Sequence, residues 1–391
     1  MRLTDYDREL AQINREISAL QRNAYSTRID AETTTKFVYR LYHRASLSGK
    51  FADFEDAEAE IDKAISRIGP AQDLCLLKAN LDFKFHRLAQ TKRDLSLAPG
   101  LFQTFHGRAL QADIAFQEGR YDEARGEYEL LINEERSWDN LARLAYLRSK
   151  MGDLGGAEQL YVEAEDEITA KEMKSFAWVE LQRGLLDLTH GHFDEAWDHY
   201  SRADRAYSGH WLIDEHVAEL LGAQHRFEEA AVRYEKVIER VPKPELQQAL
   251  GDLYALMGRQ EQAEPWYEKA LEVYLESAGR GYVHYYHHLA DFYSDVRGDA
   301  GEALKWAHKD LELRNNFSTQ AAFAWALYLD HQFQEALEVI GRALSSGVKE
   351  AGLFVQAGMI HKAAGRSNEG DGYLRLAAEL NPQFHSFHVH H

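Results

Sequence analysis

The residues with the clearest chemical potential lie between 283 and 296, in the stretch VHYYHHLADFYSDV. At helical spacing His284, His287 and Asp291 fall on one face, and Asp295 follows one turn later. Neutral imidazoles combined with a carboxylate suit Zn²⁺, Ni²⁺, Co²⁺ or Fe²⁺. The pattern therefore indicates a candidate transition-metal site at His284, His287 and Asp291.

Two alternatives to this metal site remain open. The stretch contains no His-Glu-x-x-His or paired-cysteine motif, so it could equally be a solvated helix face whose histidines make hydrogen bonds. The ending FHSFHVHH is a second place where a transition metal could bind. If the histidine helix does hold an ion, Glu245 and Asp252 on the preceding helix could supply further oxygen ligands.

The rest of the chain carries no recognisable catalytic arrangement. There is no G-x-S-x-G motif and no glycine-rich phosphate loop after a strand. The single cysteine, Cys75, lacks a recognisable catalytic neighbourhood. We therefore expect a protein that is not an enzyme and has no cofactor apart from the metal considered above.

Composition limits the partners. The formal net charge of −19 disfavours nucleic acid and anionic membrane surfaces and favours cations or basic peptides. One cysteine fits a reducing compartment. The first residues include no apolar signal segment, and no stretch approaches the roughly 18 apolar residues of a membrane span. We expect a cytoplasmic protein.

The elements that must position these side chains form an internal repeat. Four similar stretches are GRYDEA at 119–124, GHFDEA at 191–196, HRFEEA at 225–230 and HQFQEA at 331–336. Seven of the nine intervals between successive anchor positions are 33 or 34 residues, and the other two are 39 and 40. The anchors are Ala57, Thr91, Ala124, Ala157, Ala196, Ala230, Ala263, Ala303, Ala336 and Gly370.

A second periodic feature lies twelve residues before each anchor. Nine of these ten positions hold alanine or glycine, which predicts two helices that cross closely in every unit. The exception is Asp291, which has Ala290 beside it, so one extra residue in that turn would restore the frame. The positions are Ala45, Ala79, Ala112, Ala145, Gly184, Ala218, Gly251, Asp291, Ala324 and Gly358.

Five successive units also carry tyrosine four residues after the anchor, and prolines stand where several second helices should stop. The combined pattern resembles the tetratricopeptide repeat (TPR) family over residues 35–382, and the C-terminal end is similar to that of stand-alone bacterial members. The resemblance implies an all-α, right-handed α-solenoid of about ten helix-turn-helix repeats, making roughly one superhelical turn. The tyrosines and prolines are Tyr128, Tyr161, Tyr200, Tyr234, Tyr267, Pro70, Pro242 and Pro382.

Two terminal segments flank the predicted solenoid. Residues 1–34 are expected to form an N-terminal capping helix and a linker, and residues 383–391 a histidine-rich tail. The tail histidines are His385, His388, His390 and His391. The N-terminal helix has one apolar stripe, which indicates either a cap on the exposed end of the array or a dimerising helix. The stripe comprises Leu3, Tyr6, Leu10, Ile13, Ile17 and Leu20.

The family resemblance implies that the first helix of each pair lines a concave groove that binds an extended peptide or a helical segment. Many predicted groove positions are acidic, which favours a basic peptide, although acidic faces are commonly just solvated. The predicted groove residues are Tyr146, Trp178, Glu215, Glu219, Glu245, Asp252, His284, His287, Asp291 and Asp295.

One predicted helix conflicts with this frame. The repeat places Trp178 and Leu181 on the concave side, and Glu180, Arg183 and Asp187 where core residues are expected. We prefer a slip of the frame near the preceding insertion as the explanation. If the frame holds instead, the apolar patch would be a peptide anchor.

The sequence therefore favours a non-enzymatic scaffold or adaptor for protein–protein interaction. One alternative is a protein that binds or delivers a transition metal through the histidine helix. A second alternative is a regulatory or assembly subunit of a larger enzyme complex.

Overall fold

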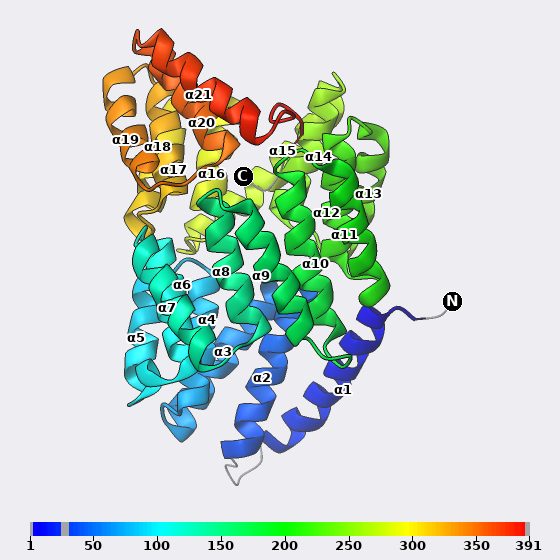
Figure 1. Ribbon diagram of the computed structural model, residues 1–391. Helices are drawn as coiled ribbons and strands as arrows, with labels where there is room; N and C mark the ends of the chain where they lie inside the picture. The colour runs from blue at the N-terminus through cyan, green and yellow to red at the C-terminus, as the bar shows by residue number, and fades with distance from the viewer. Residues whose placement is uncertain (1–2, 25–30, 388–391) are drawn as a thin grey trace.

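The computed structural model describes residues 3–24 and 31–387 of the chain. The described residues form helices joined by short turns, with no strand among them, which confirms the all-α fold (Figure 1). None of these helices has the length and apolar character that crossing a membrane requires. In order they are α1 (Asp5–Ala24), α2 (Ala31–Ser48), α3 (Phe51–Ile68), α4 (Gln72–Lys84), α5 (Leu88–Leu97), η1 (Leu101–Gln103), α6 (Phe105–Gln117), α7 (Tyr121–Glu134), α8 (Trp138–Lys150), α9 (Leu154–Glu167), α10 (Met173–Leu188), α11 (Phe193–Ala206), α12 (Trp211–Ala223), α13 (Phe227–Arg240), α14 (Pro244–Leu256), α15 (Gln260–Gly279), α16 (Tyr286–Asp291), η2 (Phe292–Arg297), α17 (Ala300–Leu313), α18 (Phe317–Leu329), α19 (Phe333–Ser345), α20 (Ala351–Ala363) and α21 (Ser367–Leu380).

From α2 onward the described helices pair into hairpins, an even-numbered helix followed by an odd-numbered one. In each hairpin the residue two positions before the second helix is left-handed. Glycine adopts this conformation without steric cost, and a few polar residues tolerate it. The residues are Gly49, His86, Gly119, Gly152, Gly191, His225, Gly258, Gly298, His331 and Gly365.

The predicted repeat register is confirmed. All nine non-glycine anchors, from Ala57 to Ala336, are completely buried in the second helices. The small residues twelve positions earlier lie at the helix crossing. A Cβ atom added at Gly251 would stand 2.6 Å from Cε1 of Tyr267, the tyrosine four residues after the anchor. The recurring small residues are therefore required by close packing within each hairpin.

The exception at Asp291 has the expected cause. Ala290 is buried with 1% of its surface exposed and takes the small-residue position of its hairpin. The six residues of η2, Phe292–Arg297, form a π-helix. A π-helical turn holds one residue more than an α-helical turn, so the following helix returns to the common frame.

The frame also holds in α10, so the expected slip is wrong. Gly184 is buried against Tyr200, as Gly251 is against Tyr267. Glu180 is buried in the core because its carboxylate accepts a 2.6 Å hydrogen bond from Arg202 and is paired with a histidine. Ion pairing of this kind allows charged side chains to occupy core positions.

The solenoid completes a superhelical turn after about six hairpins, so the expected single turn for ten units is wrong. Residues roughly 200 positions apart are joined by hydrogen bonds, for example from Asn316 to the carbonyl of Gln117 at 3.2 Å. The backbone N–H of Lys349 donates to the carbonyl of Lys150 at 2.8 Å. The second turn therefore stacks on the first, with α17 and α18 above α6 and α7 in Figure 1.

The N-terminal helix α1 packs on α10–α13, the last hairpins of the first turn. Its side chains Tyr6, Ile13 and Ile17 are buried in the core that also contains residues of α10–α13. The Ser208 hydroxyl donates to the Asp5 carboxylate at 2.6 Å. In Figure 1 α1 lies beside the lower ends of the green helices. Tyr6, Ile13 and Ile17 of the apolar stripe are therefore occupied by intramolecular packing, whereas Leu3 is 60% exposed.

Candidate functional site

A cavity of about 760 Å³ lies inside the superhelix. Its walls come mainly from the first helices of the hairpins, including α2 and α4 of the first turn and α12 and α16 further along. The lining is rich in aromatic rings, histidines and lysines, with Glu245 as its acidic side chain among the described residues. The principal side chains are His43, Phe51, Phe54, Lys84, Phe85, His86, Trp138, Lys174, Trp178, Leu181, Tyr207, His210, Trp211, Lys243, Glu245, His284, Tyr285, His287 and His288.

His284 belongs to an aromatic cluster in this wall. Its ring stacks on Phe51 with centroids 4.9 Å apart and planes at 19°, and lies 5.0 Å from Phe85. Only 8% of the residue is exposed. Burial lowers the pKa of His284 to about 3, so the imidazole is neutral at physiological pH. The geometry makes His284 a packing residue at the contact between the two turns.

Three lysines bring positive charge to the cavity. Lys174 pairs with Glu9 at 2.6 Å and Lys243 pairs with Glu245 at 2.5 Å. Lys84 has no ion-pair partner within the described chain, and its Nζ lies 5.3 Å from the centroid of the Phe54 ring. The surrounding protein, followed by the charge of Lys243, lowers the pKa of Lys84 to about 8. Lys84 is reachable from the cavity and is available to an anionic ligand group.

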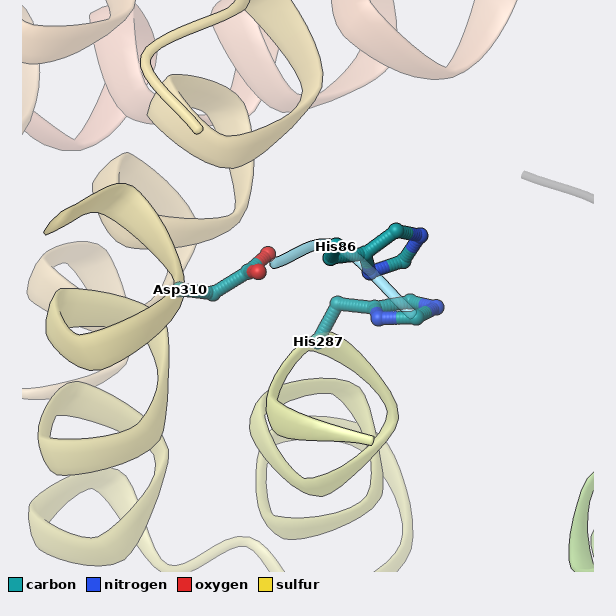
Figure 2. Close-up of side chains that lie close together, drawn as sticks. All are labelled: His86, His287 and Asp310. Carbon is teal, nitrogen blue, oxygen red and sulfur yellow. The ribbon is translucent and has the colours of Figure 1, made fainter. Parts of the chain in front are cut away.

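At one end of the cavity two histidines and an aspartate from distant elements converge. His86 stands at the left-handed turn before α5, His287 on α16 and Asp310 on α17. One ligand atom from each lies within 4.8 Å of the others (Figure 2). His287 was predicted as a ligand, whereas His284 and Asp291 fall outside this group. The group therefore combines one residue of the first superhelical turn, His86, with two residues of the second turn.

Burial sets the protonation state of the two histidines in this group, and Arg314 pairs with the aspartate. Burial, and then the Arg314 charge, hold the pKa of His86 well below its usual value. Burial and then neighbouring His288 do the same for His287. The Asp310 carboxylate accepts hydrogen bonds of 3.1 and 2.7 Å from Arg314. Both imidazoles are therefore neutral at physiological pH, which is the state that binds metals.

Comparison with known proteins agrees with the hairpin architecture. Residues 244–276, which comprise α14 and most of α15, match the family model described as Tetratricopeptide repeat. The match covers one hairpin of the solenoid. A comparison with the curated proteins finds no match.

Solved structures similar to this chain are remote in sequence. Yeast Tom70 is 12% identical, with 96% of this chain and 92% of that chain covered and a TM-score of 0.43. A tetratricopeptide repeat protein from Parabacteroides merdae ATCC 43184 is 16% identical, with 71% and 93% covered and a TM-score of 0.37. The APC/C hetero-tetramer Cut9-Hcn1 is 13% identical, with 88% and 74% covered and a TM-score of 0.44. Such scores carry no functional argument.

The predicted groove residues do not form one surface. Trp178, Glu245, His284 and His287 line the cavity. Tyr146, which is 40% exposed, instead packs against Phe116, with ring centroids 5.5 Å apart. The sequence predicted which residues face the concave side of the solenoid, and only some of these residues line the cavity.

The predicted acidic residues are largely engaged elsewhere. Glu215 and Glu219 are at most 1% exposed, and Glu215 pairs with His216 at 2.5 Å. Asp252 accepts a 2.8 Å hydrogen bond from Tyr267, and burial raises its pKa to about 6. Asp295 accepts one from Trp325 at 3.2 Å.

Asp291 is also surrounded by protein. Burial, followed by the charges of Asp295 and Asp310, raises its pKa to about 8. Tail residues His388, His390 and His391 lie outside the described residues, so the predicted tail site is not described here. Phe387, just before them, is buried against Gly222 and Tyr234.

Sequence reasoning missed several lining residues, notably Lys84, His86 and Trp211. The repeat could have identified the turn position of His86, because glycine or histidine occupies that position in all ten hairpins. Lys84 and Trp211 follow no comparable periodic rule. They reach the cavity because of how the two superhelical turns are stacked.

Proposed function

We propose that this protein is a non-enzymatic interaction scaffold that receives a short segment of a partner protein in its inner cavity. The observation that carries the proposal is the aromatic-walled cavity of about 760 Å³ inside the stacked turns. Pockets of roughly 300–1,000 Å³ enclose small ligands or a few side chains. The repeat fold supports protein–protein interaction in general, and the cavity size favours a short extended stretch.

The chemistry of the wall favours a segment with an apolar anchor and a carboxylate. Trp178 is 39% exposed, and its ring lies 5.8 Å from that of Trp138, so the pair offers an aromatic surface. Aromatic side chains commonly supply most of the binding free energy at such sites. Lys84 has no carboxylate partner within the described chain, and charge complementarity therefore favours an acidic group. This differs from the basic peptide that the acidic composition suggested.

A selection of random displayed peptides on the full chain tests the proposal. We expect enrichment of peptides that combine an aromatic or aliphatic residue with Asp or Glu. Lys84→Met keeps an apolar stem but removes the charge, and Trp178→Ala removes the aromatic surface. Each should weaken the selected peptides at least about tenfold, which corresponds to about 1.4 kcal/mol.

Tyr146→Ala is the matched control, because Tyr146 is as exposed as Trp178 but lies outside the cavity lining. It should leave affinity unchanged. Selection of basic peptides, or equal weakening by Tyr146→Ala, would contradict the cavity proposal and support the wider acidic groove. Failure to select any peptide would contradict both.

A further inference from the structure

We propose that His86, His287 and Asp310 form a binding site for one divalent transition-metal ion of the Zn²⁺ class, which clasps the two superhelical turns together. The three side chains come from the turn before α5, from α16 and from α17. The three side chains converge in Figure 2, and His86 and His287 also line the cavity. Two imidazole nitrogens and one carboxylate oxygen are a donor set that Zn²⁺ and similar ions favour.

The separation of the donor atoms suits closure around an ion. The three atoms lie within 4.8 Å of one another. In a tetrahedral site with bonds of about 2.0–2.1 Å, neighbouring ligand atoms stand about 3.3 Å apart. Rotation of the three side chains covers this difference, since the His86 and His287 rings are already 5.3 Å apart between centroids.

An independent observation concerns the histidine nitrogens. Nδ1 of His86 and Nδ1 of His287 are both buried, and neither has a hydrogen-bond partner in the described part of the chain. Buried polar atoms nearly always have a partner. An ion bound by one ring nitrogen fixes the ring tautomer. It also gives a buried imidazole nitrogen the partner that the described protein does not provide.

The neighbouring charges are compatible with a cation. Arg314 holds both oxygens of Asp310, but each carboxylate oxygen keeps a further lone pair for an ion.

The site has a structural consequence, because His86 belongs to the first superhelical turn and the other two ligands to the second. The rings of His86 and His287 meet where Phe51 and Phe85 also contact His284. An ion held there links residues about 200 positions apart in sequence. Binding to the folded state alone raises the unfolding temperature as the metal concentration increases.

Calorimetric titration of the full chain with ZnCl₂ and CoCl₂ tests this site. All measurements use a background in which His385, His388, His390 and His391 are replaced by glutamine, which removes the tail as a competing ligand. We expect one ion per chain, a visible Co²⁺ absorption band and a higher unfolding temperature with metal. His287→Gln and His86→Gly should each lower the affinity at least tenfold.

His225→Gly is the matched control for His86→Gly. Both histidines occupy the same left-handed turn position with φ of 59°, and seven hairpins carry glycine there. The control should bind metal as the parent does. Absence of binding by the parent, or binding by His86→Gly equal to that of the parent, would overturn the proposal. Anomalous scattering from a Zn²⁺-soaked crystal gives a test without variants, and an ion located away from these three residues would also overturn it.

Discussion

At the scale of single residues, the fold depends on where side chains are small. Gly251 and Gly184 both stand under the ring of a buried tyrosine from the second helix of the same hairpin. The tyrosine hydroxyl of Tyr267 then reaches Asp252 at 2.8 Å. A small residue and a large residue thus form one complementary contact, which repeats along the chain because each hairpin is built alike.

Substitution of Gly251 by alanine tests this contact. The new Cβ would stand 2.6 Å from the Tyr267 ring, and overpacking of this kind costs about 1–3 kcal/mol. The gain in helix propensity, about 1 kcal/mol, offsets part of this cost. We expect Gly251→Ala to lower the free energy of unfolding by up to about 2 kcal/mol in urea titrations followed by circular dichroism.

Gly341→Ala provides the comparison. Gly341 also lies inside a helix, but a Cβ added there meets nothing within 4 Å. This variant should be unchanged or more stable by up to about 1 kcal/mol. Equal destabilisation by both substitutions would show that close packing is not the reason for glycine at position 251.

At the scale of elements, the Glu9 carboxylate joins α1 to residues of α2, of α10 and of the loop after α11. The Glu9 carboxylate contacts Lys174 at 2.6 Å, the Tyr207 hydroxyl at 2.5 Å and His43 at 3.1 Å. Burial alone would raise its pKa, but the bonds from His43, Lys174 and Tyr207 outweigh burial and lower the pKa to about 2. The ionised carboxylate therefore stabilises docking of α1.

This docking predicts a specific response to acid. The folded-state pKa of Glu9 lies below its ordinary value of 4.5. Its contribution is therefore fully present above pH 4.5 and is lost as pH falls towards about 2. Glu9→Gln should remove on the order of 1–2 kcal/mol at neutral pH, after allowance for solvent screening. It should also flatten the pH dependence over that window.

Hydrogen exchange of α1 amides measures this local effect directly. Glu16→Gln is the control, because Glu16 lies on the same helix and pairs with Arg40 at a half-exposed site. The control should change exchange little. Equal exchange rates in α1 for Glu9→Gln and the parent would contradict the assigned role of Glu9.

At the scale of the whole molecule, the decisive feature is that the second superhelical turn lies on the first. The stacking begins where the sixth hairpin returns to the first, and Trp211 of α12 lies at that point. Its indole Nε1 donates to the carbonyl of Leu47 at 3.1 Å, and 7% of the residue is exposed. The ring also lies against Gly49, where an added Cβ would be in close contact with it. Removing the indole takes away a contact between elements that are far apart in sequence.

We therefore expect Trp211→Ala to destabilise the protein by about 3–5 kcal/mol, the usual cost of deleting a large buried aromatic side chain. The radius of gyration from small-angle scattering should increase, because the turns separate. Trp197→Ala is the control, since 39% of Trp197 is exposed on α11. It should change stability by less than about 1 kcal/mol. An unchanged radius of gyration for a folded Trp211→Ala protein would show that other contacts suffice to hold the turns together.

The sequence by itself determined the hairpins, their number and their register. A small residue opposite a tyrosine, and glycine or histidine at the left-handed turn, are requirements that act within one hairpin of 33 or 34 residues in most units. Such local requirements recur in the sequence and can be recognised there. The sequence also indicated the extra residue of the π-helix at Phe292–Arg297, because Ala290 stands one position before the place that the repeat assigns to a small residue.

Only the tertiary structure decided which hairpins meet across the superhelix. The number of units per turn depends on a small rotation between neighbours that accumulates over about six hairpins, and no single residue records it. Glu215 and Glu219, which the sequence placed in a groove, are buried near Tyr200 and Tyr234 of the helices beside α12. The accumulated rotation brings His86 to His287, a pairing that helical spacing within one segment cannot predict.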